Sequence, residues 1–91
     1  MNIDSYKQKK TIVYENKSFV LYDVIFFSNL FCFDDEGKVI WRIGDYLNNP
    51  VLIMDVVLTK EGQLRVFDAY QRRFDVDIEN GTLSNMEVIF K

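Results

Sequence analysis

The 91-residue sequence has no histidine, one cysteine and one proline, and these shortages narrow what the chain can do. Without histidine, the commonest general base and the commonest metal ligand are both missing. The lone Cys32 cannot form an internal disulfide, which suits a reducing compartment. No residue pattern indicates a catalytic or metal site, so we expect a protein that is not an enzyme and that needs neither metal nor cofactor.

Long apolar runs are also missing. The longest, residues 19–27, is interrupted by Asp23 and falls far short of the roughly 20 residues that a membrane helix needs. Residues 1–10 lack the apolar segment of a signal peptide. With 48% hydrophobic and 15% aromatic residues, the chain has enough apolar material for one small core. We expect one cytoplasmic domain over residues 1–91, with residues 1–10 flexible and no membrane partner.

The sequence does contain an internal repeat. Residues 23–26 and 29–34 (DVIF and NLFCFD) return as residues 55–58 and 63–68 (DVVL and QLRVFD). Each copy continues through a turn into another strand-like segment. The offset between the copies drifts slightly, as it would if the loops differed in length and the strands did not. We therefore expect two related units, over about residues 18–43 and 51–79.

Apolar and polar residues alternate with the period of β-strands, and no sustained helical period is present. Strands are expected at 11–15, 18–27, 30–34, 39–43, 51–59, 63–68, 72–79 and 82–90. The sequences Asp35-Glu36-Gly37 and Asn80-Gly81 are typical of hairpin turns. Eight short strands predict an all-β fold, either a small antiparallel sandwich or a partly open barrel.

Charge differs between the two ends of the chain. The formal net charge is −3, yet residues 1–17 carry four lysines against Asp4 and Glu15, so the remainder is the more acidic part. An acidic body repels nucleic-acid phosphate, because affinity for DNA or RNA comes mostly from neutralising the backbone charge. We expect no direct nucleic-acid partner.

The most distinctive candidate site is a row of carboxylates in the strand expected after residue 71. Side chains alternate across a strand, which would place Asp75, Asp77 and Glu79 together on the face opposite the core. Such a row could bind a cationic partner. It could equally be a solvated strand face that neighbouring arginines such as Arg65 neutralise. The sequence leaves both interpretations open.

A second acidic group, Asp34, Asp35 and Glu36, occupies the tip of the first expected hairpin. It could add to an acidic binding surface, although acidic residues beside Gly37 are also ordinary turn chemistry. Tyr70 precedes two arginines in another loop. It is a plausible aromatic contact, because tyrosine is enriched at the centres of protein interfaces.

Asp23 and Asp55 each interrupt an apolar strand at the same place in the repeat. A carboxylate in such a position must be paired or hydrogen-bonded, so we expect each to accept a backbone N–H or an arginine. The alternative is a pair of catalytic acids in a small hydrolase, which would require both to converge in one cleft.

Aromatic residues and the single cysteine are expected to fill the core. The aromatics could instead form a stacking platform for bases, but interleaved basic residues would then be expected. Cys32 has no histidine to activate it and is interpreted as a small core residue. The aromatic residues concerned are Phe26, Phe27, Phe31, Phe33 and Trp41.

Residues 29–43, 62–68 and 73–82 together carry one succession of motifs: a strand, an acidic turn with glycine, an I-W-x-I strand, and then a strand ending at a glycine. Over roughly residues 18–83 this resembles a family of small bacterial β-rich proteins, similar to immunity proteins of polymorphic and contact-dependent toxin systems. The strand motifs also resemble blades of quinone-type or kelch-like propellers. Gln71 stands where the pattern has glycine.

The resemblance implies a non-catalytic protein that binds and neutralises a cognate toxin, such as a nuclease with a basic active site. The acidic surface would then mimic phosphate, with Tyr70 as the aromatic anchor and a monomer or weak homodimer as the free state. The alternative is a generic binding or scaffold module that self-associates through a strand edge. The expected contact residues are Asp75, Asp77, Glu79, Asp34, Asp35 and Glu36.

Overall fold

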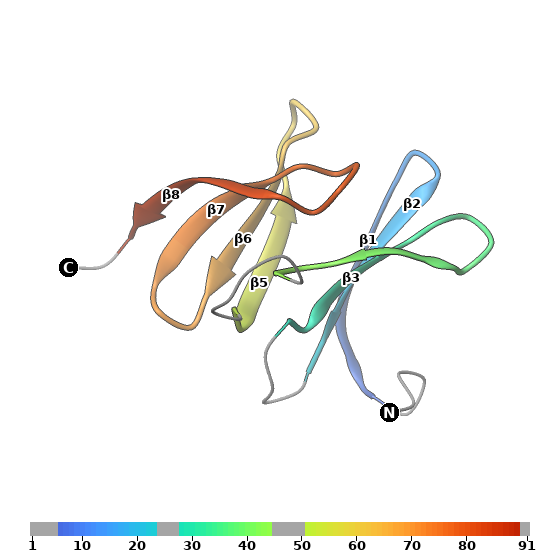
Figure 1. Cartoon of the computed structure of the whole chain (residues 1–91), viewed down its shortest axis with the longest axis horizontal. Coiled ribbons are helices and arrows are strands. Elements are labelled where there is room, and N and C mark those ends of the chain that lie inside the picture. The colour runs from blue at the N-terminus through green and yellow to red at the C-terminus, as the bar shows by residue number, and fades with distance from the viewer. Residues whose placement is uncertain (1–5, 24–27, 45–50, 90–91) are drawn as a thin grey trace.

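The computed structural model describes residues 6–23, 28–44 and 51–89, and these contain eight strands and no helix (Figure 1). The all-β prediction is therefore confirmed. The strands are β1 (Gln8–Tyr14), β2 (Lys17–Tyr22), β3 (Leu30–Phe33), β4 (Val39–Arg42), β5 (Ile53–Leu58), β6 (Leu64–Asp68), β7 (Arg72–Val76) and β8 (Leu83–Val88).

The strands form two antiparallel sheets, each a four-stranded meander. The first sheet has the order β1-β2-β3-β4 and the second β5-β6-β7-β8, and the two are not closed into a barrel. The sheets meet where β1 and β2 contact β5. In Figure 1 the second sheet lies to the left of the first, and the end of β8 points away from it.

The inner faces of both sheets form one apolar core, as strand alternation requires. Its largest side chains are almost fully excluded from solvent. Burial of this apolar surface is the main contribution to stability. The core residues are Phe19, Leu21, Leu30, Cys32, Trp41, Ile43, Val51, Ile53, Val56, Leu64, Val66, Phe74 and Val76.

Trp41 joins the first sheet to the β7–β8 turn of the second. Its indole N–H donates to the carbonyl of Ile78 at 2.9 Å. A Cβ placed on Gly81 would lie 2.7 Å from the indole ring, and the φ of Gly81 is +76°. Gly81 is therefore required both for the turn and for the close approach of the tryptophan.

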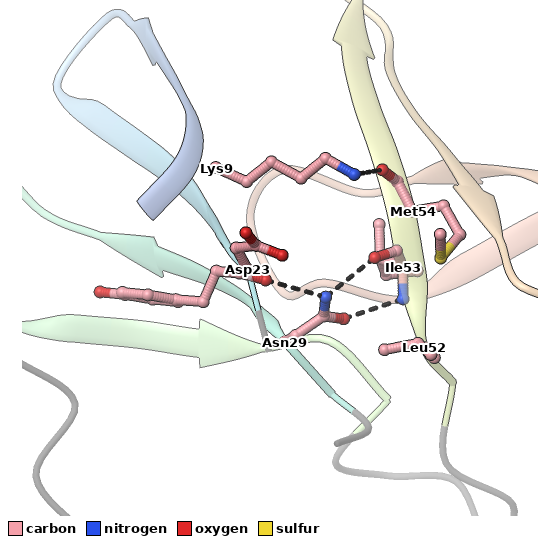
Figure 2. A pocket seen from close by; sticks show the side chains of 7 residues that line it. Lys9, Asp23, Asn29, Leu52, Ile53 and Met54 are labelled. Carbon is pink, nitrogen blue, oxygen red and sulfur yellow. Dashed lines mark hydrogen bonds between the residues drawn. The ribbon is translucent and has the colours of Figure 1, made fainter. Parts of the chain in front are cut away.

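Asn29 makes the second connection between the sheets, and its side chain is buried (Figure 2). Its amide oxygen accepts the N–H of Ile53 at 2.8 Å, while its amide nitrogen donates to the carbonyl of Ile53 at 2.8 Å. The amide thus imitates a strand neighbour for β5. It occupies backbone groups at the free edge of β5 that would otherwise lack partners.

Several strand boundaries differ from those predicted. β7 ends at Val76, so Asp77 and Glu79 lie in the turn that follows and do not form a row with Asp75 on one strand face. The cause is local, because the side chain of Asp77 accepts the N–H of Glu79 at 2.8 Å and starts the turn. β1 begins at Gln8, three residues earlier than the strand expected at 11–15.

The repeat does not place Asp23 and Asp55 equivalently. β2 ends at Tyr22 and Asp23 follows it, whereas Asp55 lies inside β5. The hairpin register shows the mismatch, because Leu21 pairs with Leu30 in one unit and Leu58 pairs with Leu64 in the other. The two units correspond more closely in the strands that follow, β3 with β6 and β4 with β7, than in β2 and β5.

The aromatic residues divide between two faces, which corrects the expectation that they all fill the core. Trp41 is in the core, but Phe31 and Phe33 alternate with buried Cys32 and lie half-buried on the opposite face of the first sheet. Phe26 and Phe27 lie outside the described residues.

Candidate functional site

Four hairpin turns lie along one end of the molecule, which we call the turn end (Figure 1). They are the β1–β2, β3–β4, β5–β6 and β7–β8 turns, at residues 14–17, 34–38, 59–63 and 77–82. The meander topology explains the arrangement, since alternate turns of an up-and-down sheet share one end. The β6–β7 turn lies at the opposite end.

Side-chain contacts hold the turns of the two sheets together. The Lys17 ammonium of the first sheet lies 3.6 Å from the carboxylate of Glu79 in the second. A Cβ on Gly62 would lie 2.7 Å from the hydroxyl of Tyr14, so the β1–β2 and β5–β6 turns also touch. Together with the Trp41 contact under Gly81, these interactions connect the β1–β2, β5–β6 and β7–β8 turns and place β4 against the last of them.

The turn end is strongly acidic. Its four turns hold seven carboxylates and only three lysines. This excess of four negative charges exceeds the net charge of −3 of the whole chain. The carboxylates belong to Glu15, Asp34, Asp35, Glu36, Glu61, Asp77 and Glu79, and the lysines are Lys17, Lys38 and Lys60.

The β3–β4 turn is held rigidly by its first residue. One carboxylate oxygen of Asp34 accepts the N–H groups of Glu36 and Lys38, each at 2.9 Å. Asp34 therefore has a structural role, as turn chemistry suggested. Asp35 and Glu36 are exposed at the tip.

The β7–β8 turn is built in a related way. Asp77 caps the N–H of Glu79, and its own carbonyl accepts the N–H of Gly81 at 2.7 Å. The Glu79 side chain is 73% exposed despite its contact with Lys17. The structure therefore brings Asp77 and Glu79 to the same end of the molecule as Asp34 and its neighbours.

Asp75 lies elsewhere, on the outer face of the second sheet. Its carboxylate accepts a hydrogen bond from the guanidinium of Arg65 at 3.0 Å and another from the amide of Asn85 at 2.8 Å. The hydrogen bond from Asn85, followed by Arg65, holds the pKa of Asp75 below its ordinary value. Asp75 is thus already neutralised within the molecule, the alternative that the sequence left open.

Tyr70 lies in the β6–β7 turn, at the opposite end from the acidic turns (Figure 1). Its side chain is 63% exposed, and the guanidinium of Arg72 is 5.1 Å from the ring centroid. Arg72 is itself anchored by the buried carboxylate of Asp68 at 2.6 Å. Tyr70 is therefore an exposed ring beside an anchored guanidinium, but it does not share a surface with the acidic turns.

Asp23 lines a shallow cavity of about 190 Å³ at the seam between the sheets (Figure 2). Lys9 crosses the same region and donates to the carbonyl of Met54 at 2.8 Å. Asp55 does not line this cavity. Its carboxylate instead accepts the N–H of Val56 at 2.9 Å and lies 3.2 Å from the ammonium of Lys10. Asp55 thus accepts a backbone N–H, as expected, and its charged partner is a lysine in place of the arginine that was expected.

Cys32 is buried, as predicted for a core residue. Burial raises the pKa of its thiol to about 11, so the reactive thiolate is scarce at neutral pH. The charges of Lys17, Glu79 and Asp34 also act on this thiol, as expected if they surround the turn end of β3. Among the described residues, no group of three potential ligands could hold a metal ion.

Comparisons with known proteins assign no family to the chain. No family model matches it, and no curated protein matches it either. Within the described part of the chain, no helix has the length and apolarity needed to cross a membrane.

Proposed function

We propose that this protein is a non-catalytic immunity-type protein that neutralises a basic protein toxin by covering it with the turn end. One observation carries the proposal: turns from both sheets gather seven carboxylates and three lysines on one surface. Like charges that are gathered in this way repel one another and give the fold nothing by themselves. A basic partner relieves this repulsion by pairing with the carboxylates, which favours binding.

An acidic surface of this kind favours rapid association with a basic protein. An acidic surface steers a basic protein toward it, and association can then reach roughly 10⁸–10⁹ M⁻¹s⁻¹ at low salt. A nuclease toxin carries positive charge where it holds phosphate, so carboxylates can occupy that position. The resemblance to immunity proteins of toxin systems points to the same class of partner.

Under this proposal, the contact residues are the exposed carboxylates of the turn end. Asp35 and Glu36 at the tip of the β3–β4 turn, and Asp77 and Glu79 in the β7–β8 turn, are exposed and lie at one end. Asp34 supports the first turn from beneath. A contact at the turn end includes neither Asp75, which Arg65 neutralises, nor Tyr70, which lies at the opposite end.

The test is a binding measurement with the C-terminal domain of the protein encoded immediately upstream as the probe. The variant D35N/E36Q/D77N/E79Q removes four charges while keeping side-chain size and the oxygen of residue 77 that caps its turn. We expect its association rate constant at low salt to fall about 10- to 100-fold, with loss of protection when the two are co-expressed.

The matched control is D55N/E87Q, which removes two exposed charges away from the turn end. Its association rate constant should change less than that of either turn pair, D35N/E36Q or D77N/E79Q. If the control slows association as much as the turn pairs, only net charge matters and the turn end is not the contact surface. A neighbouring domain that is neither toxic nor bound contradicts the proposed function itself.

A further inference from the structure

A second exposed surface differs in kind from the turn end. Within residues 6–23, 28–44 and 51–89, eight large hydrophobic side chains are exposed, and four of them lie around β8 and the adjacent β6–β7 turn. We call this group the β8 patch: Tyr70 (63% exposed), Met86 (55%), Val88 (45%) and Ile89 (37%). Backbone pairing brings the end of β8 beside the β6–β7 turn, because Val88 pairs with Arg72 and the N–H of Ile89 donates to the carbonyl of Gln71.

The reason for the exposure is the register of β8. Val88 is opposite Arg72, on the same face as the core residues Phe74 and Val76. Met86 lies on this inner face too, because the bulge at Asn85 adds one residue to the strand. The end of β8 extends past the first sheet (Figure 1), so the described strands of the first sheet leave this part of the core face of the second sheet uncovered.

The charges around the β8 patch are already paired within the molecule. Arg72 is bound to Asp68, and Arg73 is bound to Glu87, the single charged residue of β8. The patch therefore offers no attraction to a strongly charged partner. Instead it is a neutral region of an acidic protein, where two copies can approach without like-charge repulsion.

The other sheet edges are less suited to strand pairing. The free edge of β5 is occupied by Asn29 and by the ammonium of Lys9. β1 carries lysines and a bulge near its start, both of which discourage edge pairing. β4 also carries exposed apolar side chains, Val39 and Ile40, but it begins directly after the acidic β3–β4 turn, whose carboxylates disfavour the approach of a second acidic copy. β8 combines an open edge with exposed apolar side chains.

We propose that β8 pairs antiparallel with β8 of a second copy, forming a symmetric dimer with one continuous eight-stranded sheet. The segment after the bulge, residues 86–89, provides the paired edge. The twofold axis passes through Val88, so the two copies of Val88 lie directly opposite one another and Met86 of each copy lies diagonal to Val88 of the other. This inference is independent of the proposed function, because the acidic turns remain exposed at the other end.

The test is sedimentation equilibrium of the whole chain over about 1 µM to 1 mM, at low and high salt. We expect the mass to rise from 10.8 kDa toward twice that value with concentration, with little effect of salt, because apolar and backbone contacts are screened weakly. In V88K, two ammonium groups face each other across the axis. The dissociation constant of the dimer should therefore rise at least about tenfold.

The matched control is V13K, which makes the same substitution at an exposed valine of β1, on the other sheet. It should leave the dissociation constant unchanged. Because Val88 is partly exposed, V88K should retain the wild-type circular dichroism spectrum, and M86K provides a second disruption at the same edge. A mass of 10.8 kDa at every concentration overturns the inference, as does a V13K variant that dissociates as readily as V88K.

Discussion

The outer faces of the two sheets are built differently, although both sheets are four-stranded antiparallel meanders. The outer face of the first carries stacked rings: Tyr22 lies edge-on to Phe31 at 5.6 Å, and Phe31 stacks on Phe33 at 6.1 Å. The outer face of the second carries ion pairs, Arg65 with Asp75 and Arg73 with Glu87. Strand alternation is the same in both sheets, so the difference comes from side-chain chemistry alone.

The outer faces of the two sheets are thus stabilised in two different ways, by ring packing in the first sheet and by ion pairs in the second. In the first sheet, rings cover their neighbours sideways, and Val20 and Tyr22 are each only 5% exposed. That burial contributes through the hydrophobic effect and depends little on salt or pH. Partly exposed ion pairs contribute about 0.2–1 kcal/mol each and weaken as salt rises. Side chains on the outer face of the first sheet should therefore contribute more to the free energy of unfolding than those on the outer face of the second sheet.

The largest expected effect is at the centre of the ring cluster. Phe31 contacts Tyr22 and Phe33 and lies under the guanidinium of Arg42 at 5.1 Å. We expect F31A to lower the free energy of unfolding by about 2–3 kcal/mol, because it removes apolar burial and two ring contacts. Urea denaturation followed by tryptophan fluorescence measures this change.

The matched control is F67A on the outer face of the second sheet. Phe67 is paired with Asp55 and Arg73, so its ring has charged neighbours in place of aromatic ones. Its removal should cost about 1 kcal/mol. Equal losses for F31A and F67A would contradict the distinction between the two faces.

The next effect is the coupling within the Arg65–Asp75 pair. The side chains are 37% and 21% exposed, so screening by water limits the interaction. A double-mutant cycle of R65A and D75A should give a coupling energy of about 0.5–1 kcal/mol that decreases in 1 M salt. A coupling that salt does not change would mean that the pair acts through packing of the arginine stem.

Features of the fold that depend on residues close together in the chain could be predicted from the sequence more fully than features that depend on distant residues. Strand positions followed from alternation, and the turns at Gly37 and Gly81 followed from local chemistry. The end of β7 was missed because the Asx turn at Asp77 overrides an alternation that continues to Glu79 in the sequence. The hydrogen bond from the N–H of Glu79 to Asp77 therefore determined the end of the strand, and the alternation of apolar and polar residues did not.

The candidate site shows the opposite limitation. The acidic turns were visible in the sequence, but their meeting at one end needed the meander topology and contacts such as Lys17 with Glu79. Glu15 and Glu61 gave no signal of their own, because each is one acidic residue in an ordinary turn. Conversely, Asp75 was expected to form one row with Asp77, but β7 ends between them and Asp75 accepts hydrogen bonds from Arg65 and Asn85.

Acidic pH should weaken the interactions of Asp75 on the outer face of the second sheet. Because the pKa of Asp75 is lower in the folded state, its ionised form stabilises the protein above the unfolded-state value of 3.8. That stabilisation is lost as the pH falls below 3.8 and through the folded-state pKa. The difference in unfolding free energy between wild type and D75N should therefore shrink between pH 6 and about pH 2. The cost of F31A should not change in the same way, and a parallel change in both would contradict the assignment to Asp75.

The smallest expected effect is the difference in backbone strain between two turns of the same design, the β6–β7 turn and the β3–β4 turn. Asp68 caps the β6–β7 turn as Asp34 caps the β3–β4 turn, and the fourth residue of each turn has positive φ: +63° for Gln71 and +84° for Gly37. A side chain is strained there, at a cost of about 1 kcal/mol, whereas glycine is not. Glycine also makes the unfolded chain more flexible, which offsets part of the gain.

We therefore expect Q71G to raise the free energy of unfolding by about 0.5 kcal/mol, and the reverse change G37Q to lower it by a similar amount. The pair is a clean test, because a Cβ on Gly37 would meet nothing within 4 Å and only the backbone conformation is at issue. Thermal denaturation of both variants measures the two changes under one set of conditions. If G37Q is neutral while Q71G is stabilising, the strain belongs to contacts of the Gln71 side chain and not to its φ.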